Sequence, residues 1–156
     1  MHGTTLTLLN ACRRKFGSSD AAGKVFVTSG LGGMSGAQAK AASITGCIGV
    51  IAEIDLGHLQ KRHRQGWLDE YTDNVDEIIE KIKIYREQKK PISIGYHGNI
   101  VVLWERFAEI YKETGEMIVD IGSDQTSCHD ITGGGYLPGE KPVNLKYFLV
   151  IRTKLI

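Results

Sequence analysis

The chain has 156 residues, a length typical of one domain, and its 42% hydrophobic and 24% charged residues are an ordinary globular balance. Its net charge of +1 gives neither the basic footprint of a nucleic-acid-binding protein nor the polybasic signal of a membrane-surface protein. No apolar run approaches the roughly 18 residues that span a bilayer, no secretory signal opens the chain, and three scattered cysteines predict a reducing, cytoplasmic location.

Strands and helices are predicted to alternate along the chain. The first half contains a helix over 5–16, a short apolar strand over 25–27, an alanine-rich helix over 37–46 and a buried strand over 47–55. The second half contains a polar, basic helix over 58–66, a helix over 75–87, a strand over 89–99, a helix over 100–112 and a strand over 116–125.

This order predicts an α/β fold, a Rossmann-like, doubly wound and mostly parallel sheet with helices on both faces. We interpret the basic run of the helix over 58–66 as a solvated helix face, and Asp73 or Asn74 as the cap of the helix that follows. The end of the chain, 144–156, follows the pattern least clearly and could be a further strand.

The 19 glycines cluster at 30–36 and 133–135, which indicates special backbone positions rather than general flexibility. Gly30, Gly32 and Gly36 form the pattern G-x-G-x-x-x-G, one residue longer than the dinucleotide-binding fingerprint. The pattern lies between the first predicted strand and a helix, where backbone N–H groups and the helix dipole would face a pyrophosphate. Glycine-rich turns also serve helix–strand packing, and the pattern alone leaves that alternative open.

An acidic residue at the end of the second predicted strand is the other part of the dinucleotide signature. Glu53 stands about 20 residues after Gly32, as the signature requires. A carboxylate there accepts hydrogen bonds from both hydroxyls of an adenosine ribose and would repel a 2′-phosphate, so NAD is predicted rather than NADP. Asp55 is the competing acid, and the bland alternative is that both are solvated acids at a strand end.

Polar and reactive side chains fill 123–130, directly after the last predicted strand. The carboxyl ends of parallel strands form the ligand crevice of an open α/β sheet, so we expect this segment at the site; a hydrogen-bonded turn is the alternative. Cys128 beside His129 suggests a nucleophile with its base, but no further motif orients the pair, and we assign no catalytic residue. His97 is interpreted as a packed histidine, and a metal site built from His97, His129 and Asp130 lacks diagnostic spacing.

With these features placed, the chain resembles the urocanase family through four motifs in the same order, VTSGLGGMSGAQ, IGVIAEID, SIGYHGN and DQTSCHD…GYLP. The resemblance is strongest to animal-type members. It implies a Rossmann-like NAD-binding domain over 1–138, with 139–156 as a C-terminal extension. In this family tightly bound NAD+ acts as an electrophile toward urocanate, water adds, and imidazolone propionate is released in histidine breakdown. The resemblance also implies a homodimer for the full-length enzyme.

The glycine pattern and the resemblance together give a set of residues expected to contact NAD. In this set Glu53 holds the ribose, and Cys128 is a cofactor contact, because the family's catalytic cysteine lies in a C-terminal portion that this sequence lacks. The set is Gly30, Gly32, Gly33, Met34, Ser35, Glu53, Asn99, Ile100, Gln125, Thr126, Ser127, Cys128, His129, Tyr136 and Leu137.

The sequence also departs from the family pattern. His58 stands where many bacterial members have an arginine, and 130–135 replaces a Pro-Leu-Asn-Gly-like turn. Family members run to several hundred residues, so we expect this chain to be an excised or truncated NAD domain that is inactive alone. The alternatives are a non-catalytic module that binds a nucleotide or a partner and, with less support, a conventional NAD dehydrogenase, for which no hydride-site base stands out.

Overall fold

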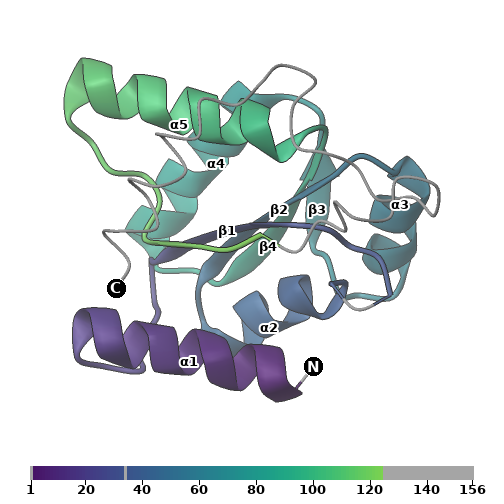
Figure 1. The fold of residues 1–156 in the computed structure, drawn as a ribbon, viewed down its shortest axis with the longest axis horizontal. Helices are drawn as coiled ribbons and strands as arrows, with labels where there is room; N and C mark the ends of the chain where they lie inside the picture. The colour runs from purple at the N-terminus through teal and green to yellow at the C-terminus, as the bar shows by residue number, and fades with distance from the viewer. Residues whose placement is uncertain (1, 34, 125–156) are drawn as a thin grey trace. The chain divides into compact units, whose positions relative to one another are not determined.

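The computed structural model describes residues 2–33 and 35–124. The chain divides into two compact units, 1–125 and 126–156, and the described residues all belong to the first. The elements in chain order (Figure 1) are α1 (His2–Phe16), β1 (Val25–Ser29), α2 (Ala37–Thr45), β2 (Ile48–Glu53), α3 (Leu56–Arg64), β3 (Glu70–Thr72), α4 (Val75–Gln88), β4 (Ile92–His97), α5 (Ile100–Thr114) and β5 (Ile121–Gly122).

The strands form one sheet of order β3-β4-β2-β1-β5, and every strand pair is parallel. From β1 the chain places β2 beside it and β3 at the edge, then inserts β4 between β2 and β3. It then crosses back to place β5 on the other side of β1. The predicted parallel α/β sheet is therefore confirmed. The direction of winding reverses between β1 and β5, and ligands of open α/β sheets bind at the carboxyl ends of the strands at such a point.

Both faces of the sheet are covered by helices, with α4 and α5 on one side and α1, α2 and α3 on the other (Figure 1). Side chains of one strand alternate between these layers. Val25 and Val27 belong to the cluster under α4 and α5, whereas Phe26 packs with Cys12 and Cys47 near α1. This double burial is why β1 has a continuous apolar run. Among the described residues, no helix is both long and apolar enough to cross a membrane.

Two strands differ from the prediction. The strand β3 was not predicted, because Glu70, Tyr71 and Thr72 are polar or half-exposed and carry no apolar pattern. Tertiary pairing makes them a strand: Tyr71 lies in register with Gly95 of β4. The strand predicted over 116–125 shrinks to two residues, because β5 pairs only with β1 at the edge of the sheet.

Other boundaries shift by a few residues for local reasons. Helix α3 begins at Leu56, earlier than predicted, because the Asp55 carboxylate accepts a hydrogen bond from the Gly57 N–H at 2.7 Å and caps the helix. Asn74, one of the two predicted caps, accepts hydrogen bonds from the first turn of α4. The predicted extension over 139–156 lies outside the described residues.

Candidate functional site

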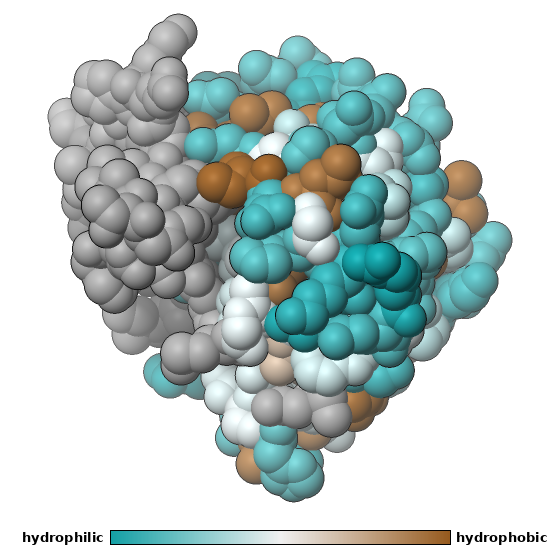
Figure 2. Space-filling view, turned by 90° about the vertical axis from the view of Figure 1, so that its right-hand side faces the viewer, coloured by the Kyte–Doolittle hydropathy of each residue, from teal (hydrophilic) through white to brown (hydrophobic). Residues whose placement is uncertain are grey.

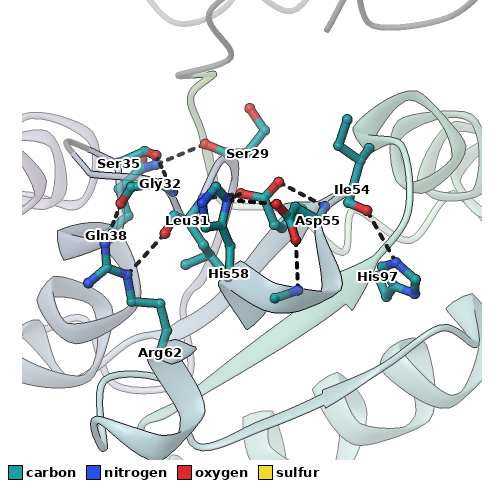
Figure 3. Close-up of polar contacts among 12 residues, drawn as sticks. Ser29, Leu31, Gly32, Ser35, Gln38, Ile54, Asp55, His58, Arg62 and His97 are labelled. Atoms are coloured by element: carbon teal, nitrogen blue, oxygen red, sulfur yellow. Dashed lines mark hydrogen bonds and ion pairs between the residues drawn. The ribbon is translucent and has the colours of Figure 1, made fainter. Parts of the chain in front are cut away.

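The glycine loop between β1 and α2 begins at Gly30, whose φ of 90° lies in the left-handed region that favours glycine. The Gly30 N–H donates to the Ala52 carbonyl at 2.8 Å, which ties the loop to the end of β2. Both backbone polar groups of Leu31 are held (Figure 3): its N–H donates to Glu53 Oε2 at 2.6 Å, and its carbonyl accepts from Arg62 Nε at 3.0 Å. The start of the loop is thereby fixed by backbone and side-chain contacts from β2 and α3.

The middle of the loop is a compact turn. The Gly32 N–H donates to Ser35 Oγ at 3.1 Å, and the Gly36 N–H donates to the Gly32 carbonyl at 3.1 Å. These bonds leave the backbone amides of Gly33 and Ser35 without a hydrogen-bond partner among the described residues. The N–H groups that the loop offers to an anion are thus those of the turn after Gly32, rather than those of the first glycines.

The glycines of this loop serve different purposes. Gly33 is exposed, and a Cβ added there would meet no atom within 4 Å, so the space above it is open to a ligand. Gly36 is buried, and a Cβ added there would lie 2.5 Å from Nη2 of Arg62. Of the glycines in the predicted pattern, Gly30 therefore makes a backbone turn and Gly36 is a packing position, whereas the open position, Gly33, is not one of the three.

Glu53, the acid predicted to hold the ribose, is the last residue of β2 and is only 6% exposed. Its Oε1 accepts a hydrogen bond from the Asp55 N–H at 3.1 Å, in addition to the bond that Oε2 accepts from Leu31. A carboxylate offers about four lone-pair sites, so two remain for ligand hydroxyls. The acid therefore lies directly against the glycine loop, as the spacing predicted.

His58 lies beside this acid in the first turn of α3. Its Nδ1 is 3.6 Å from Glu53 Oε2 and 3.8 Å from Asp55 Oδ2. Asp55, the competing acid, has a side chain that is 57% exposed and caps α3, which gives it a local structural role. The geometry favours Glu53 over Asp55 as the acid of the site, and the choice stays a prediction.

The end of β4 reaches the same rim of the sheet. His97 Nε2 lies 3.2 Å from the Ile54 carbonyl, and its ring links the ends of β4 and β2. The Asn99 side chain accepts from the Val101 N–H at 3.0 Å and caps α5. Ile100 is fully buried in the core, so a ligand contact at this position would use its backbone.

A buried polar network joins the ends of β1 and β5. Thr28 Oγ1 donates to Gln38 Oε1 at 2.6 Å and lies 2.8 Å from Ser123 Oγ, while Gln38 Nε2 donates to the Ser29 carbonyl at 2.9 Å. Ser29 Oγ also donates to Asp124 Oδ1. Sequence analysis placed Ser123 at this rim but missed Gln38, which follows the glycine loop by only two residues and is 1% exposed.

Arg62 shows that the interpretation of the basic run as a solvated helix face is wrong at this position. Arg62 is only 7% exposed, and its guanidinium donates to the carbonyls of Leu31 and Gly32. The guanidinium also lies 5.0 Å from the centre of the Trp67 ring. The signal that could have found it is helical spacing: Arg62 stands three residues after the fully buried Leu59 and shares its face. Among the coloured residues of Figure 2, most of the surface is hydrophilic, with smaller apolar patches between.

Part of the predicted set lies outside the described residues, namely Met34, Gln125, Thr126, Ser127, Cys128, His129, Tyr136 and Leu137. The described cysteines, Cys12 and Cys47, are buried near the opposite end of the sheet and belong to the core. Within the described ranges, no three His, Cys, Asp or Glu side chains are arranged to hold a metal ion.

Comparisons with known proteins agree with this geometry. The family model described as the urocanase Rossmann-like domain matches residues 1–147. The chain is 63% identical to the urocanate hydratase of Homo sapiens, 61% to a probable urocanate hydratase of Caenorhabditis elegans and 49% to one of Dictyostelium discoideum. Each match covers 138 residues, which is 88% of this chain and 20% of the relative. The chain thus spans about a fifth of the length of these curated relatives.

Proposed function

The chain belongs to the urocanase family, and from that membership we propose that it is the NAD-binding domain of a urocanate hydratase. The glycine loop is the observation that supports NAD as the ligand. Its start is clamped by Glu53 and Arg62, its turn presents open amides at Gly33 and Ser35, and the buried Glu53 carboxylate lies at its edge. This donor and acceptor set fits a diphosphate joined to a ribose with two free hydroxyls.

Each half of this set has its own part in binding NAD. The amides of the turn after Gly32 bind the pyrophosphate, and Glu53 accepts hydrogen bonds from the adenosine ribose. A 2′-phosphate next to the buried Glu53 carboxylate would be repelled, which selects NAD over NADP. The bound NAD+ supplies an electrophilic nicotinamide ring for the hydration of urocanate in histidine breakdown. Asn99, which follows β4, is a further contact in this proposal.

The activity belongs to the full-length enzyme in our proposal, a cytoplasmic homodimer in which other parts of the protein bind urocanate and supply the catalytic cysteine. The described residues contain only two cysteines, and both are buried away from the glycine loop in the core near α1. Thiolate is the reactive form of cysteine, and burial suppresses it. Since the third cysteine, Cys128, is assigned by the family resemblance to cofactor contact, this chain alone is proposed to bind NAD without turning over urocanate.

The binding proposal is tested by native mass spectrometry of the purified chain for co-purified NAD, followed by titration calorimetry. Gly33→Val places a branched side chain over the turn, and strain of about 1–3 kcal/mol against the diphosphate corresponds to a loss of about 10- to 100-fold in NAD affinity. Gly3→Val is the matched control, because a Cβ at Gly3 also meets nothing within 4 Å but lies in α1. Equal affinities of both variants and the unaltered chain would refute the proposed pyrophosphate site.

The activity proposal is tested by following the ultraviolet absorbance of urocanate with NAD present. The chain alone is expected to show no turnover, and activity is expected when it is mixed with the remaining portions of a full-length relative. Turnover by the chain alone at about 1 s⁻¹ or faster, a typical enzyme rate, would contradict the proposal. It would then assign the chemistry to residues of this chain, with Cys128 and His129 as the first candidates.

A further inference from the structure

We propose that Arg62 is a positioning residue that holds the glycine loop with its carbonyls turned inward, and that position 36 is glycine because the Arg62 guanidinium fills the volume of a side chain there. We call this contact of the Arg62 guanidinium with the loop carbonyls the clamp. The clamp is a property of this chain, and only its consequence for ligand affinity rests on the proposed NAD site.

Arg62 holds two consecutive carbonyls of the loop. Its Nε donates to the Leu31 carbonyl at 3.0 Å and its Nη2 donates to the Gly32 carbonyl (Figure 3). Its Nη1 donates to Gln65 Oε1 at 2.9 Å. A planar guanidinium fixes the directions of several N–H donors at once, which a lysine does not. The carbonyls of Leu31 and Gly32 face Arg62 inside the protein. The opposite side of the loop, at Gly33 and beyond, is therefore able to present N–H groups to an anion.

The conformation of Gly36 does not itself require glycine. Its φ of −58° and ψ of −20° are helical, and alanine is favoured over glycine in such a conformation. What excludes a side chain is contact: an added Cβ would lie 2.5 Å from Arg62 Nη2, and real Cβ atoms essentially never approach closer than 3.0 Å. Because the obstacle is the end of a flexible side chain, a methyl group at position 36 would push the guanidinium off its carbonyls rather than unfold the chain.

The charge of Arg62 has no carboxylate within 4.0 Å among the described residues. Its neighbours are two backbone carbonyls, the Gln65 amide and the Trp67 ring, which solvate a cation without neutralising it. Buried charges are ordinarily paired. A diphosphate bound over the turn would supply the missing negative charge from the other side of the loop.

The clamp is tested by a double-mutant cycle in the full 156-residue chain. Gly36→Ala alone is expected to lower the melting temperature, because it displaces Arg62 from its carbonyls. In the Arg62→Ala background the same substitution is expected to raise the melting temperature by about 2–4 °C, the gain of alanine over glycine in a helical conformation. Effects of the same sign and size in both backgrounds would overturn the steric assignment of Gly36.

Positioning is separated from simple stabilisation by ligand and loop readouts. Arg62→Ala and Gly36→Ala are each expected to shift the same backbone amide resonances of Gly32 and Gly33 and to weaken NAD binding about tenfold, with no further loss in the double variant. Arg62→Lys, which keeps the charge but not the fork, is expected to recover only part of the affinity. The effect of Gly36→Ala on the melting temperature could reverse its sign as expected while the loop resonances do not shift and the NAD affinity does not change. That result would leave Arg62 with a structural role only. If the unaltered chain binds no NAD, the proposed function fails, while the melting temperatures and loop resonances still decide the clamp.

Discussion

A carboxylate and an arginine from other elements lie near each end of β1, and the two pairs are arranged differently. At the amino end, Asp120 Oδ2 accepts from the Val25 N–H at 2.9 Å and from Arg86 Nη2 at 3.1 Å, so the two charges neutralise each other. At the carboxyl end, Glu53 accepts from the Leu31 N–H and Arg62 donates to the Leu31 carbonyl, and the two side chains form no ion pair with each other.

The difference distinguishes a structural end of the sheet from the end at which we propose that NAD binds. The Asp120–Arg86 pair completes its charge balance inside the protein and ties the amino end of the sheet to α4. Glu53 and Arg62 organise the same loop yet keep their charges separate, one at each side of the backbone. A ligand that carries both hydroxyl donors and a negative diphosphate satisfies both charges, which is the chemistry of a dinucleotide.

The largest expected effect is a contrast between the carboxylates. Glu53→Ala leaves the N–H groups of Leu31 and Asp55 without their acceptor, and Asp120→Ala does the same to the N–H of Val25. Each substitution is expected to lower the free energy of unfolding by about 1–3 kcal/mol. Glu53→Ala is also expected to weaken NAD binding by about 10- to 100-fold and to shrink the preference for NAD over NADP. Asp120→Ala is expected to leave NAD affinity unchanged.

Urea unfolding gives the stability of both variants, and calorimetry with NAD and NADP gives their affinities. The ratio of NAD to NADP affinity is the decisive number, because general loss of structure lowers both affinities together. A ratio that changes equally in both variants would remove the distinction between the two ends of the sheet.

The sequence predicted the parts of the molecule that local pattern determines. Continuous apolar runs gave the buried strands, and spacing placed Glu53 against the glycine loop. Arg62 escaped detection because its burial depends on a glycine 26 positions earlier and on carbonyls of a loop that meets α3 only in the folded chain. The strand β3 escaped for the same reason, since pairing with β4 rather than its own residues makes it a strand.

The amino end of the sheet offers a second contrast through Cys47. Burial raises the pKa of this thiol from 9.0 to about 11, with the nearby Cys12 adding to the shift and a hydrogen bond from Thr45 opposing it. Between pH 9 and about pH 11 the folded chain keeps the thiol proton of Cys47, whereas the unfolded chain releases it. The contribution of this thiol to stability is fully present below pH 9 and is lost as the pH rises to about 11. The free energy of unfolding is expected to fall by about 2–3 kcal/mol in total for this reason.

Unfolding measured from pH 8 to pH 11 in the unaltered chain and in Cys47→Ala checks this expectation. The variant loses packing at every pH, but its stability is expected to fall less steeply above pH 9, because the shared contributions of lysines and tyrosines cancel in the difference. Parallel slopes would mean that the thiol ionises as easily in the folded chain as in the unfolded one.

The smallest expected effect separates the two acids at the binding end. Asp55 caps α3 through the Gly57 N–H, so Asp55→Ala is expected to cost about 1 kcal/mol of stability, the usual cost of losing a capping side chain. Its NAD affinity and its preference over NADP are expected to stay close to those of the unaltered chain, because the Asp55 side chain is largely exposed whereas Glu53 is buried against the glycine loop. Asp55→Asn, which keeps an oxygen able to cap the helix, is the matched control and should restore most of the stability. If Asp55→Ala and Asp55→Asn weaken NAD binding and Glu53→Ala does not, Asp55 is the ribose acid. Glu53 would then serve only to hold the backbone N–H groups of Leu31 and Asp55.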